Sequence, residues 1–216
     1  PAIVAGILGA TTVSATLQAA AAAGIAVSAT GGIGGVHRGS QRDVSADLLE
    51  LARTPGLLVC AGAKSIVDPV ATADLLEELG VPVVGYGVDR LPFFLAREAQ
   101  VPLAHRVDDA RAAADVLAAS YATGAPSTVL LCNPVPAASA MAVGEVEAAV
   151  AAAEAAATAA GVRGPAVTPF LLARLAEETG GRSLEANLDL LEDNARVAGE
   201  VAAAFAAAGG ISAARS

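Results

Sequence analysis

The sequence predicts an α/β protein: a three-layer α/β/α sandwich around a mostly parallel sheet, with a helical C-terminal region and one domain over residues 1–216. Three observations lead to this prediction. Short apolar runs recur along the chain and are followed by Gly, Pro or Asn, and Ala-rich stretches of helical character separate them. A content of 55% hydrophobic and only 16% charged residues is enough to bury a substantial core.

Four apolar runs are predicted to be strands, because they are short and lack the alternation of a strand with one wet face. They are residues 25–27, 57–60, 81–86 and 129–132. Helices are expected where Ala and other good helix formers dominate, over residues 11–23, 46–53, 69–79, 108–121 and 143–160. Two more are expected between residues 168 and 205, separated by residues 179–183. Loops after parallel strands build active sites, so the residues that follow each run are the candidates for function.

Composition excludes several classes of partner. A net charge of −9, no Trp, two Tyr and four Phe argue against binding nucleic acid, which favours a basic face with aromatic side chains. Residues 1–36 carry no charge, but recurrent Gly, Thr and Ser and the lack of a basic flank favour a buried strand-helix-strand unit over a membrane or signal segment. Cys60 and Cys132 have no metal-type spacing and predict no disulfide framework, so we expect a reducing cytoplasm.

Lys64 is the first candidate for chemistry, because it is the only lysine among 13 basic residues. Arginine replaces lysine everywhere else, which indicates that this position needs a primary amine that can lose its proton. Such an amine can attack a carbonyl carbon and form an imine, whereas a guanidinium cannot. Lys64 also follows an apolar strand run directly, where active-site loops lie. The alternative is an ordinary solvated lysine.

Two further segments carry candidate residues. Residues 30–39 contain five glycines together with His37 and Arg38, which predicts either a phosphate-binding loop or a flexible turn. Residues 43–47 follow, and there Asp43 or Ser45 is a good N-cap for the next helix, while a carboxylate could also bind a divalent metal or move a proton. His105 is interpreted as structural.

Seven motifs in order along the chain resemble the pseudouridine-5'-phosphate glycosidases. They are Gly9-Ala-Thr-Thr-Val13, Thr30-Gly-Gly-Ile-Gly-Gly-Val-His-Arg-Gly39, Asp43-Val-Ser-Ala-Asp47, Cys60-Ala-Gly-Ala-Lys-Ser65, Asn133-Pro-Val-Pro136, Thr168-Pro-Phe-Leu-Leu-Ala-Arg174 and Thr179-Gly-Gly-Arg-Ser-Leu-Glu-Ala-Asn187. The resemblance implies reversible cleavage of the C–C glycosidic bond of pseudouridine 5'-phosphate to uracil and ribose 5-phosphate. It also implies a divalent metal, typically Mn²⁺, and a homotrimer.

The resemblance assigns roles to particular residues. Lys64 matches the nucleophile that forms an imine with ribose C1', and Asp43 matches the metal ligand. Substrate contacts are implied for Val13, Ser45, Ala46 and Asp47, with Asp47 a candidate for proton transfer, and phosphate contacts for Thr12, Thr30 and His37. Asn187 matches an asparagine beside uracil, where an amide can donate and accept together. Asn133 is a weaker candidate, since Asn-Pro is also an ordinary turn.

Two departures from the family pattern stand out. The family has a segment before the Gly-Ala-Thr-Thr block that carries a catalytic glutamate, thought to donate a proton, and a second substrate-binding lysine. Nothing in this sequence corresponds to them, so we expect a truncated chain, and Glu50 and Glu98 are not substitutes. The stretch between Gly39 and Asp43 is also short. Two alternatives stay open: a non-catalytic phosphosugar-binding or scaffold protein, and an aldolase-like enzyme that forms an imine with phosphosugars.

Overall fold

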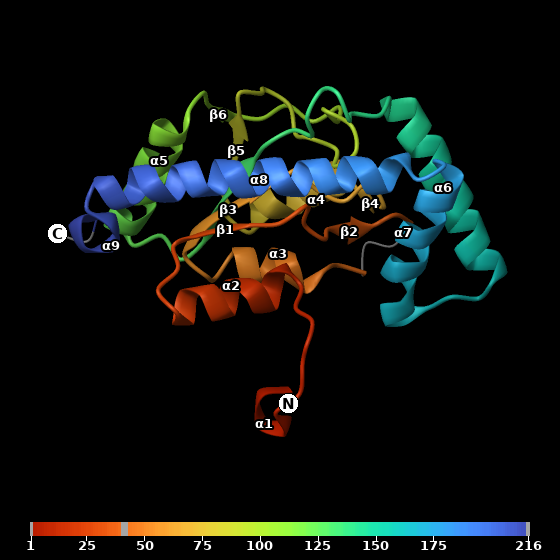
Figure 1. The fold of residues 1–216 in the computed structure, drawn as a ribbon, viewed down its shortest axis with the longest axis horizontal. Helices are drawn as coiled ribbons and strands as arrows, with labels where there is room; N and C mark the ends of the chain where they lie inside the picture. Colours follow the sequence, from red (N-terminus) through yellow and green to blue (C-terminus); the bar gives the residue numbers. More distant parts are fainter. Residues whose placement is uncertain (1, 40–42, 215–216) are drawn as a thin grey trace.

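The computed structural model describes residues 2–39 and 43–214, and its centre is a five-stranded parallel sheet (Figure 1). The strand order is β1-β3-β7-β5-β6, and every neighbouring pair is parallel. The strands are β1 (Val27–Ala29), β3 (Gly56–Cys60), β5 (Val83–Tyr86), β6 (His105–Val107) and β7 (Thr128–Cys132). Because all strands run the same way, their carboxyl ends and the loops after them lie at one edge of the sheet.

Helices cover both faces of the sheet, which confirms the predicted three layers. In β3, Leu57 and Val59 belong to a core with α5 (Ala110–Thr123) and α8 (Arg182–Ala207), whereas Leu58 and Cys60 belong to a core with α2 (Val13–Ala22), α3 (Ala46–Leu51) and α4 (Pro69–Glu78). Alternate residues of a strand point to opposite faces, so a continuous apolar run fills two cores at once.

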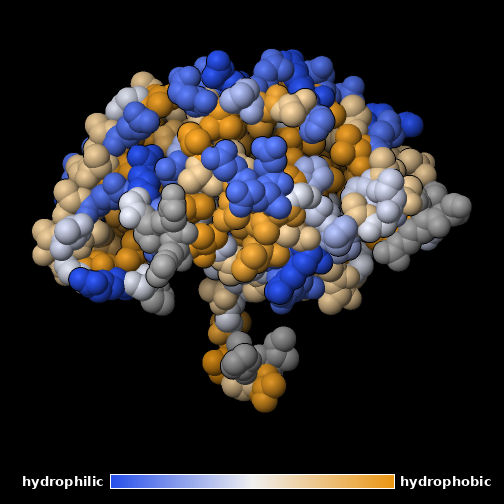
Figure 2. Space-filling view, turned by 180° about the vertical axis from the view of Figure 1, so that it is seen from behind, coloured by the Kyte–Doolittle hydropathy of each residue, from blue (hydrophilic) through white to orange (hydrophobic). Residues whose placement is uncertain are grey.

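The remaining elements lie at the ends of the sheet. The helices α6 (Val143–Ala159) and α7 (Val167–Glu178) pack together at one end, with the short η1 (Gly164–Ala166) between them, and α9 (Gly210–Ala214) lies at the other (Figure 1). A small antiparallel pair joins β2 (Val36–His37) to β4 (Val67–Asp68). The short α1 (Ala2–Ala5) lies apart from the body at the end of an extended segment (Figure 1), and Figure 2 shows hydrophobic surface on this arm.

The structure shifts one predicted strand and adds three. The first strand is Val27–Ala29 and not residues 25–27, because Ile25 closes the turn after α2 through its N–H, which donates to the carbonyl of Ala20 at 2.8 Å. β6 was not predicted: it is a polar edge strand without an apolar run, and β2 and β4 have two residues each. Among the described residues, no helix is both long and apolar enough to cross a membrane.

Candidate active site

The loops after β1 and β3 continue side by side beyond the sheet. The N–H of Ala61 donates to the carbonyl of Gly31 at 2.8 Å, and the N–H of Ile33 donates to the carbonyl of Gly62 at 3.0 Å. The N–H of Lys64 then donates to the carbonyl of Ile33 at 3.0 Å. The glycine-rich loop and the loop that carries the lysine are therefore fixed to each other by backbone hydrogen bonds, as the order of the strands predicts.

Lys64 is partly buried and lines two cavities, and Thr30 lines both of them as well. The first, here called the apolar cavity, has a volume of about 240 Å³ and is lined otherwise by Gly31, Gly32, Phe94, Leu95, Leu172, Leu175, Ala176, Ser183, Leu184, Asn187 and Leu191. The second, here called the threonine cavity, has a volume of about 190 Å³ and is lined otherwise by Thr11, Thr12, Val13, Thr16, Leu17, Ala29 and Leu58. An amine at this position can reach groups bound on either side.

The apolar cavity depends on a close contact between Gly32 and Phe94. A Cβ atom on Gly32 would lie 2.7 Å from Cδ2 of Phe94 and 3.0 Å from the carbonyl oxygen of Gly62. Phe94 has a φ of 56°, the only positive φ of a non-glycine residue in the described part of the chain, and its N–H donates to the carbonyl of Ala61 at 2.9 Å. Such backbone strain is typical of functional sites, where the surrounding structure maintains it.

The threonine cavity brings together three residues that the sequence assigned to substrate. Thr12 is the N-cap residue of α2, and its hydroxyl is 2.9 Å from that of Ser14. Val13 begins the helix, and Thr30 follows β1. Hydroxyl groups near a helix N-terminus suit an anion such as a phosphate, because the first N–H groups of a helix have no partner within it and the helix dipole favours negative charge. Of these N–H groups in α2, that of Ser14 already donates to Asp47.

Asp47 lies beneath the glycine-rich loop and is almost fully buried. Its carboxylate accepts from the N–H of Ser14 at 3.0 Å and from the N–H of Gly34 at 2.9 Å, which joins the start of α2 to the loop. Ser45 is the N-cap residue of α3, with its hydroxyl accepting from the N–H of Asp47 at 3.2 Å, and Ala46 is the first helical residue. These contacts position the loop, while the predicted contacts of Ser45, Ala46 and Asp47 with substrate stay predictions.

His37 and Asp43 lie in a third cavity, which Lys64 does not line. Its volume is about 320 Å³, and Arg38, Glu154 and Thr158 also line it. Within the described residues, no three His, Cys, Asp or Glu side chains come together to hold a metal ion. Asp43 and His37 carry a carboxylate and an imidazole, which are ligand types that Mn²⁺ accepts, and metal binding at Asp43 stays a prediction. The short stretch between Gly39 and Asp43 lies outside the described residues.

Similarity to known proteins identifies the family of this chain. The family model described as "Indigoidine synthase A like protein" matches residues 1–204. The chain is a member of the indigoidine synthase A-like family. A pseudouridine-5'-phosphate glycosidase of Myxococcus xanthus is 51% identical over 202 residues, covering 93% of this chain and 67% of that protein. A pseudouridine-5'-phosphate glycosidase of Chloroflexus aurantiacus is 56% identical over 199 residues, covering 90% of this chain and 65% of that protein. The predicted resemblance is confirmed, and the chain spans about two thirds of the length of these relatives.

Solved structures of the family agree with the fold. The prealnumycin C-glycosynthase AlnA, in complex with ribulose 5-phosphate, is 45% identical with a TM-score of 0.89, over 96% of this chain and 69% of that chain. An indigoidine synthase A-like protein of Thermotoga maritima is 39% identical with a TM-score of 0.82, over 89% of this chain and 63% of that chain. These values confirm the α/β class.

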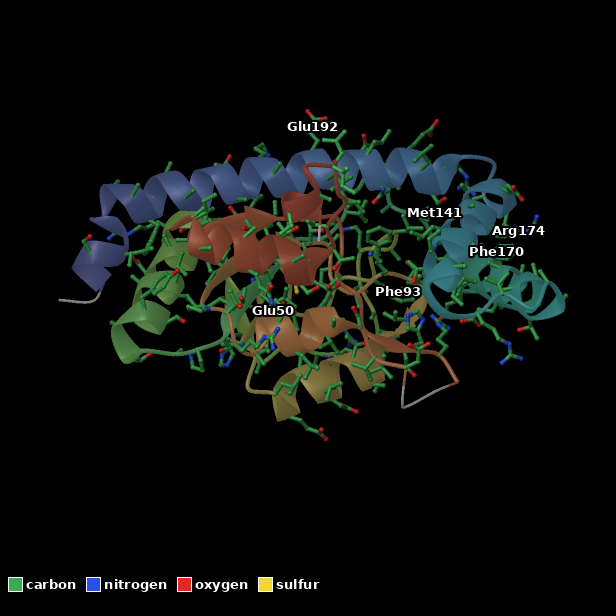
Figure 3. The ribbon with its side chains drawn as sticks, turned by 90° about the horizontal axis from the view of Figure 1, so that it is seen from below. Glu50, Phe93, Met141, Phe170, Arg174 and Glu192 are labelled. Carbon is green, nitrogen blue, oxygen red and sulfur yellow. The ribbon has the colours of Figure 1, made fainter. Side chains whose placement is uncertain are left out.

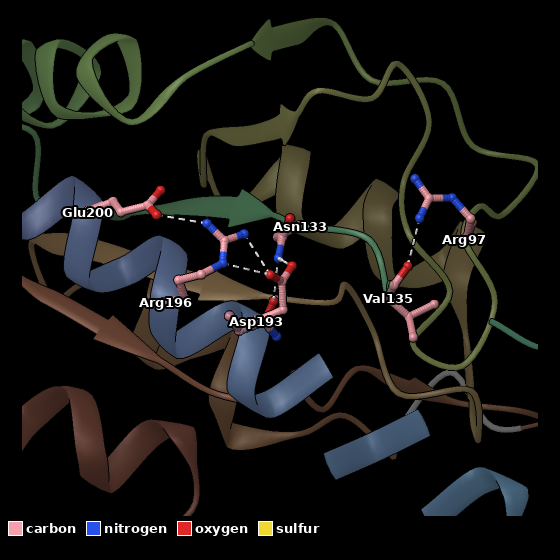
Figure 4. A network of polar contacts seen from close by, with 7 residues as sticks. Arg97, Asn133, Val135, Asp193, Arg196 and Glu200 are labelled. Atoms are coloured by element: carbon pink, nitrogen blue, oxygen red, sulfur yellow. Dashed lines mark hydrogen bonds and ion pairs between the residues drawn. The ribbon is translucent and has the colours of Figure 1, made fainter. Parts of the chain in front are cut away.

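Sequence reasoning named Asn133 only as a weaker candidate and missed the polar network that joins it to Asp193 and Arg196 (Figure 4) and, through Asn194, to Thr30. The side-chain amide of Asn133 donates to Asp193 at 2.8 Å and to Asn194 at 3.0 Å, and that of Asn194 donates to the carbonyl of Thr30 at 2.8 Å. Burial would raise the pKa of Asp193, but the hydrogen bonds from Asn133 and Arg196 hold it below its usual range. The available signal was an asparagine seven residues after Asn187, on the same face of a helix.

Glu50, which the sequence analysis did not accept as a substitute for the family's catalytic glutamate, has a structural environment. It lies on α3 close to α2, on the part of the molecule away from Phe170 and Arg174 of α7 (Figure 3). Its carboxylate accepts from Gln18 at 2.8 Å, from Arg53 and from Thr54. Burial would raise the pKa of Glu50, but these hydrogen bonds outweigh it and lower the pKa below 4.5. A carboxyl group that stays ionised is unsuited to donate a proton.

Proposed function

We propose that this chain cleaves the C–C glycosidic bond of pseudouridine 5'-phosphate reversibly to uracil and ribose 5-phosphate. The observation that carries the proposal is the position of Lys64 between two cavities of different character. The threonine cavity suits the phosphosugar, and the apolar cavity, with Asn187 as an amide on its wall, suits the flat base. Relatives named pseudouridine-5'-phosphate glycosidases, and a structural relative in complex with ribulose 5-phosphate, support it.

The chemistry explains why a lysine is needed. A carbon leaving group departs far less readily than a nitrogen one. The amine of Lys64 bonds to C1' as the C1'–O4' bond breaks and O4' takes a proton. The nitrogen lone pair then forms a C1'=N bond as the bond from C1' to the base breaks, and the base takes the bonding pair and a proton at carbon. Water hydrolyses the imine, which releases ribose 5-phosphate and restores the amine.

The other assigned residues bind and orient. Thr12, Thr30 and the backbone at Val13 would hold the sugar phosphate, and Asn187 would pair with the imide edge of uracil. His37 and Ser45 to Asp47 complete the proposed substrate contacts, the first from the third cavity and the others through the glycine-rich loop.

We also propose that Asp43 binds Mn²⁺ or another divalent metal. The support is the carboxylate and imidazole chemistry of Asp43 and His37, which line the same cavity.

We propose that the chain forms a homotrimer in a reducing cytoplasm. The exposed side chains of Val4, Ile7 and Leu8 support association, because apolar groups that project from the body gain most when a second chain covers them. The two cysteines are buried and free, which fits a reducing compartment.

Reductive trapping tests the covalent step. The chain is incubated with ribose 5-phosphate and Mn²⁺, reduced with borohydride and mapped by mass spectrometry. We expect an adduct on Lys64 and none in Lys64→Arg. A folded chain that gives no adduct contradicts the assigned role of Lys64 in this chain, and the same trap on the Myxococcus xanthus relative shows whether the role fails in the family.

Release of uracil separates the alternatives. With pseudouridine 5'-phosphate as substrate, the proposed enzyme yields free uracil that absorbs in the ultraviolet, and the release needs Lys64. An aldolase-like enzyme would form the imine with phosphosugars but release no uracil. A scaffold or binding protein would keep its affinity for ribose 5-phosphate in Lys64→Arg.

A further inference from the structure

The polar network behind the apolar cavity has its centre at Asn194 on α8. This side chain is fully buried, and its amide donates to two backbone carbonyls, those of Thr30 at 2.8 Å and Gly31 at 3.3 Å. Its side-chain oxygen accepts from Asn133 at 3.0 Å. Both donor hydrogens and the acceptor of Asn194 are thus used, so the side chain can occupy only one orientation without losing a hydrogen bond.

The carbonyls that Asn194 binds belong to the loop that lines both cavities of Lys64. The carbonyl of Gly31 also accepts from the N–H of Ala61, and the loop continues through Ile33, whose carbonyl accepts from the N–H of Lys64. A displacement of the Thr30 and Gly31 carbonyls would therefore be transmitted directly to the lysine loop.

Asn194 also joins the glycine-rich loop to α8, which carries the amide of the cavity wall. Asn187 lies seven residues earlier, which is two helical turns or about 10 Å along the same face. The helix packs directly on Gly31 between these residues: a Cβ atom there would lie 3.2 Å from Oδ1 of Asn187 and 3.3 Å from Cδ1 of Leu190. Rotation of α8 by a few degrees would move Asn187 relative to Lys64.

Asn133 connects the third strand to the same point. It follows β7, its N–H donates to the carbonyl of Cys60 at 2.8 Å, and its side chain donates to Asn194 and to Asp193 (Figure 4). The carboxyl ends of β1, β3 and β7 are thereby joined to α8 by two buried asparagines.

We infer that Asn194, oriented by Asn133, is a positioning residue that holds Asn187 and residues 30–32 in a fixed place relative to Lys64. This inference rests on the proposed function for its consequence in catalysis, but the positioning itself can be measured without any reaction. A purely structural role is the competing explanation, since buried amides are costly unless they are satisfied and a satisfied one stabilises the fold.

Three variants separate these explanations. Asn194→Asp keeps the shape and the acceptor for Asn133 but turns an oxygen toward the carbonyls of Thr30 and Gly31. Asn194→Leu removes all polar contacts of this side chain without adding a charge and serves as a second variant. Thr128→Val is the control: Thr128 is fully buried and donates to the carbonyl of Thr54, at the amino end of the same strand that leads to Asn133.

Hydrogen exchange measured by mass spectrometry tests the positioning directly. In both Asn194 variants, we expect peptides that contain residues 30–33 and 61–64 to exchange about tenfold faster, while peptides of α5 keep their protection. Thr128→Val should leave these loop peptides unchanged. Unchanged exchange of the loop peptides in folded Asn194→Asp and Asn194→Leu, or a uniform increase over the whole chain, would overturn the inference.

The rate of reductive trapping on Lys64 tests the consequence of this positioning for catalysis. At equal folded fraction, we expect Asn194→Asp to slow adduct formation about tenfold and Thr128→Val to leave the rate within about twofold, even if both lower stability equally. Relative to the wild-type rate at the same pH, part of the loss should be recovered in acid, where a protonated carboxyl at position 194 can donate to the carbonyl of Thr30. If the wild-type chain forms no adduct, the proposed function fails, and the exchange experiment alone decides the inference.

Discussion

At the scale of single residues, two positions in the candidate site offer what no other residue type supplies. Lys64 contributes an amine between two cavities, and Gly32 contributes the absence of a side chain beside Phe94. Lys64 is easy to pick out from the sequence, because it is the single lysine beside twelve arginines. Gly32 cannot be picked out from the neighbouring glycines, since the residue that leaves no room for a side chain there is Phe94, 62 positions later.

Gly32→Ala tests this contact. The new methyl group would lie 2.7 Å from Phe94 and 3.0 Å from the carbonyl of Gly62, so we expect a loss of stability of about 1–3 kcal/mol and slower trapping on Lys64. Gly144→Ala, in α6 with nothing within 4 Å, is the matched control and should stabilise by about 0.5–1 kcal/mol. Urea unfolding measures both values, and equal effects of the two substitutions would contradict the expectation.

Asp43 gives a second prediction at this scale. Mn²⁺ binding can be measured from the loss of the free-ion signal in electron paramagnetic resonance. We expect the affinity to fall at least about tenfold in Asp43→Asn, because a neutral amide is a poorer ligand for a hard cation. Asp74→Asn removes an exposed carboxylate on α4 and should leave binding unchanged. Equal affinity of Asp43→Asn and the wild type would remove Asp43 from the metal site.

The two cysteines give a third prediction at this scale. Cys60 and Cys132 face each other in the register of β3 and β7, both are buried, and the hydrogen bond with Cys60, together with burial, raises the pKa of Cys132 well above its ordinary value. Because the thiolate is the reactive form, a disulfide reagent at pH 8 should modify the folded chain far more slowly than the urea-unfolded chain. Rapid modification of two thiols in the folded chain would contradict this.

At the scale of elements, the contact between α2 and α3 depends on Glu50. Its carboxylate accepts from Gln18 of α2 and from Arg53 and Thr54 after α3, and its pKa is lowered in the folded chain. A lowered pKa means that the stabilisation is present at neutral pH and is lost as the pH falls through the folded value, which lies below 4.5.

We therefore expect Glu50→Gln to be less stable than the wild type by about 1–3 kcal/mol at pH 7, and the difference to shrink below pH 4.5. Glu98→Gln, at an exposed position, should change little at either pH. Chemical unfolding at pH 7 and pH 4 supplies the comparison, and a difference for Glu50→Gln that does not vary with pH would show that the lost contacts are not those of the ionised form.

At the scale of the whole molecule, local patterns predict what local interactions determine. The runs that became β3, β5 and β7 are apolar, and α3, α4 and α5 begin at the N-cap residues Ser45, Asp68 and Asp109, so these elements were predicted. The helices α6, α7 and α8 lack a side-chain cap and were predicted from their helix-forming composition. The polar edge strand β6 was missed, because its only requirement is an adjacent strand with free backbone groups.

Long-range contacts within the site were not visible for the same reason. Asn194 meets Thr30 across 164 positions of sequence, and nothing near either residue indicates the other. Lys64 could be proposed because a single lysine is conspicuous, and the motif residues could be proposed from the family resemblance, and both stay predictions. The side chains that position them gave only the weak signal of two asparagines seven residues apart.

The arm at residues 2–8 gives the last prediction. Leu8 is fully exposed, and Ile7 and Val4 are mostly exposed, on a segment that projects from the body (Figure 1). A buried leucine or isoleucine contributes about 1.5–3 kcal/mol, so a few such residues per chain can support association. We expect light scattering to give three times the chain mass of 21.0 kDa, and Ile7→Glu with Leu8→Glu to reduce it to that of one chain without loss of helical circular dichroism. Ile25→Glu, at an exposed position beside α2, should stay trimeric. A wild-type chain with the mass of a monomer would exclude the homotrimer, and a trimer in the double variant would assign the association to another surface.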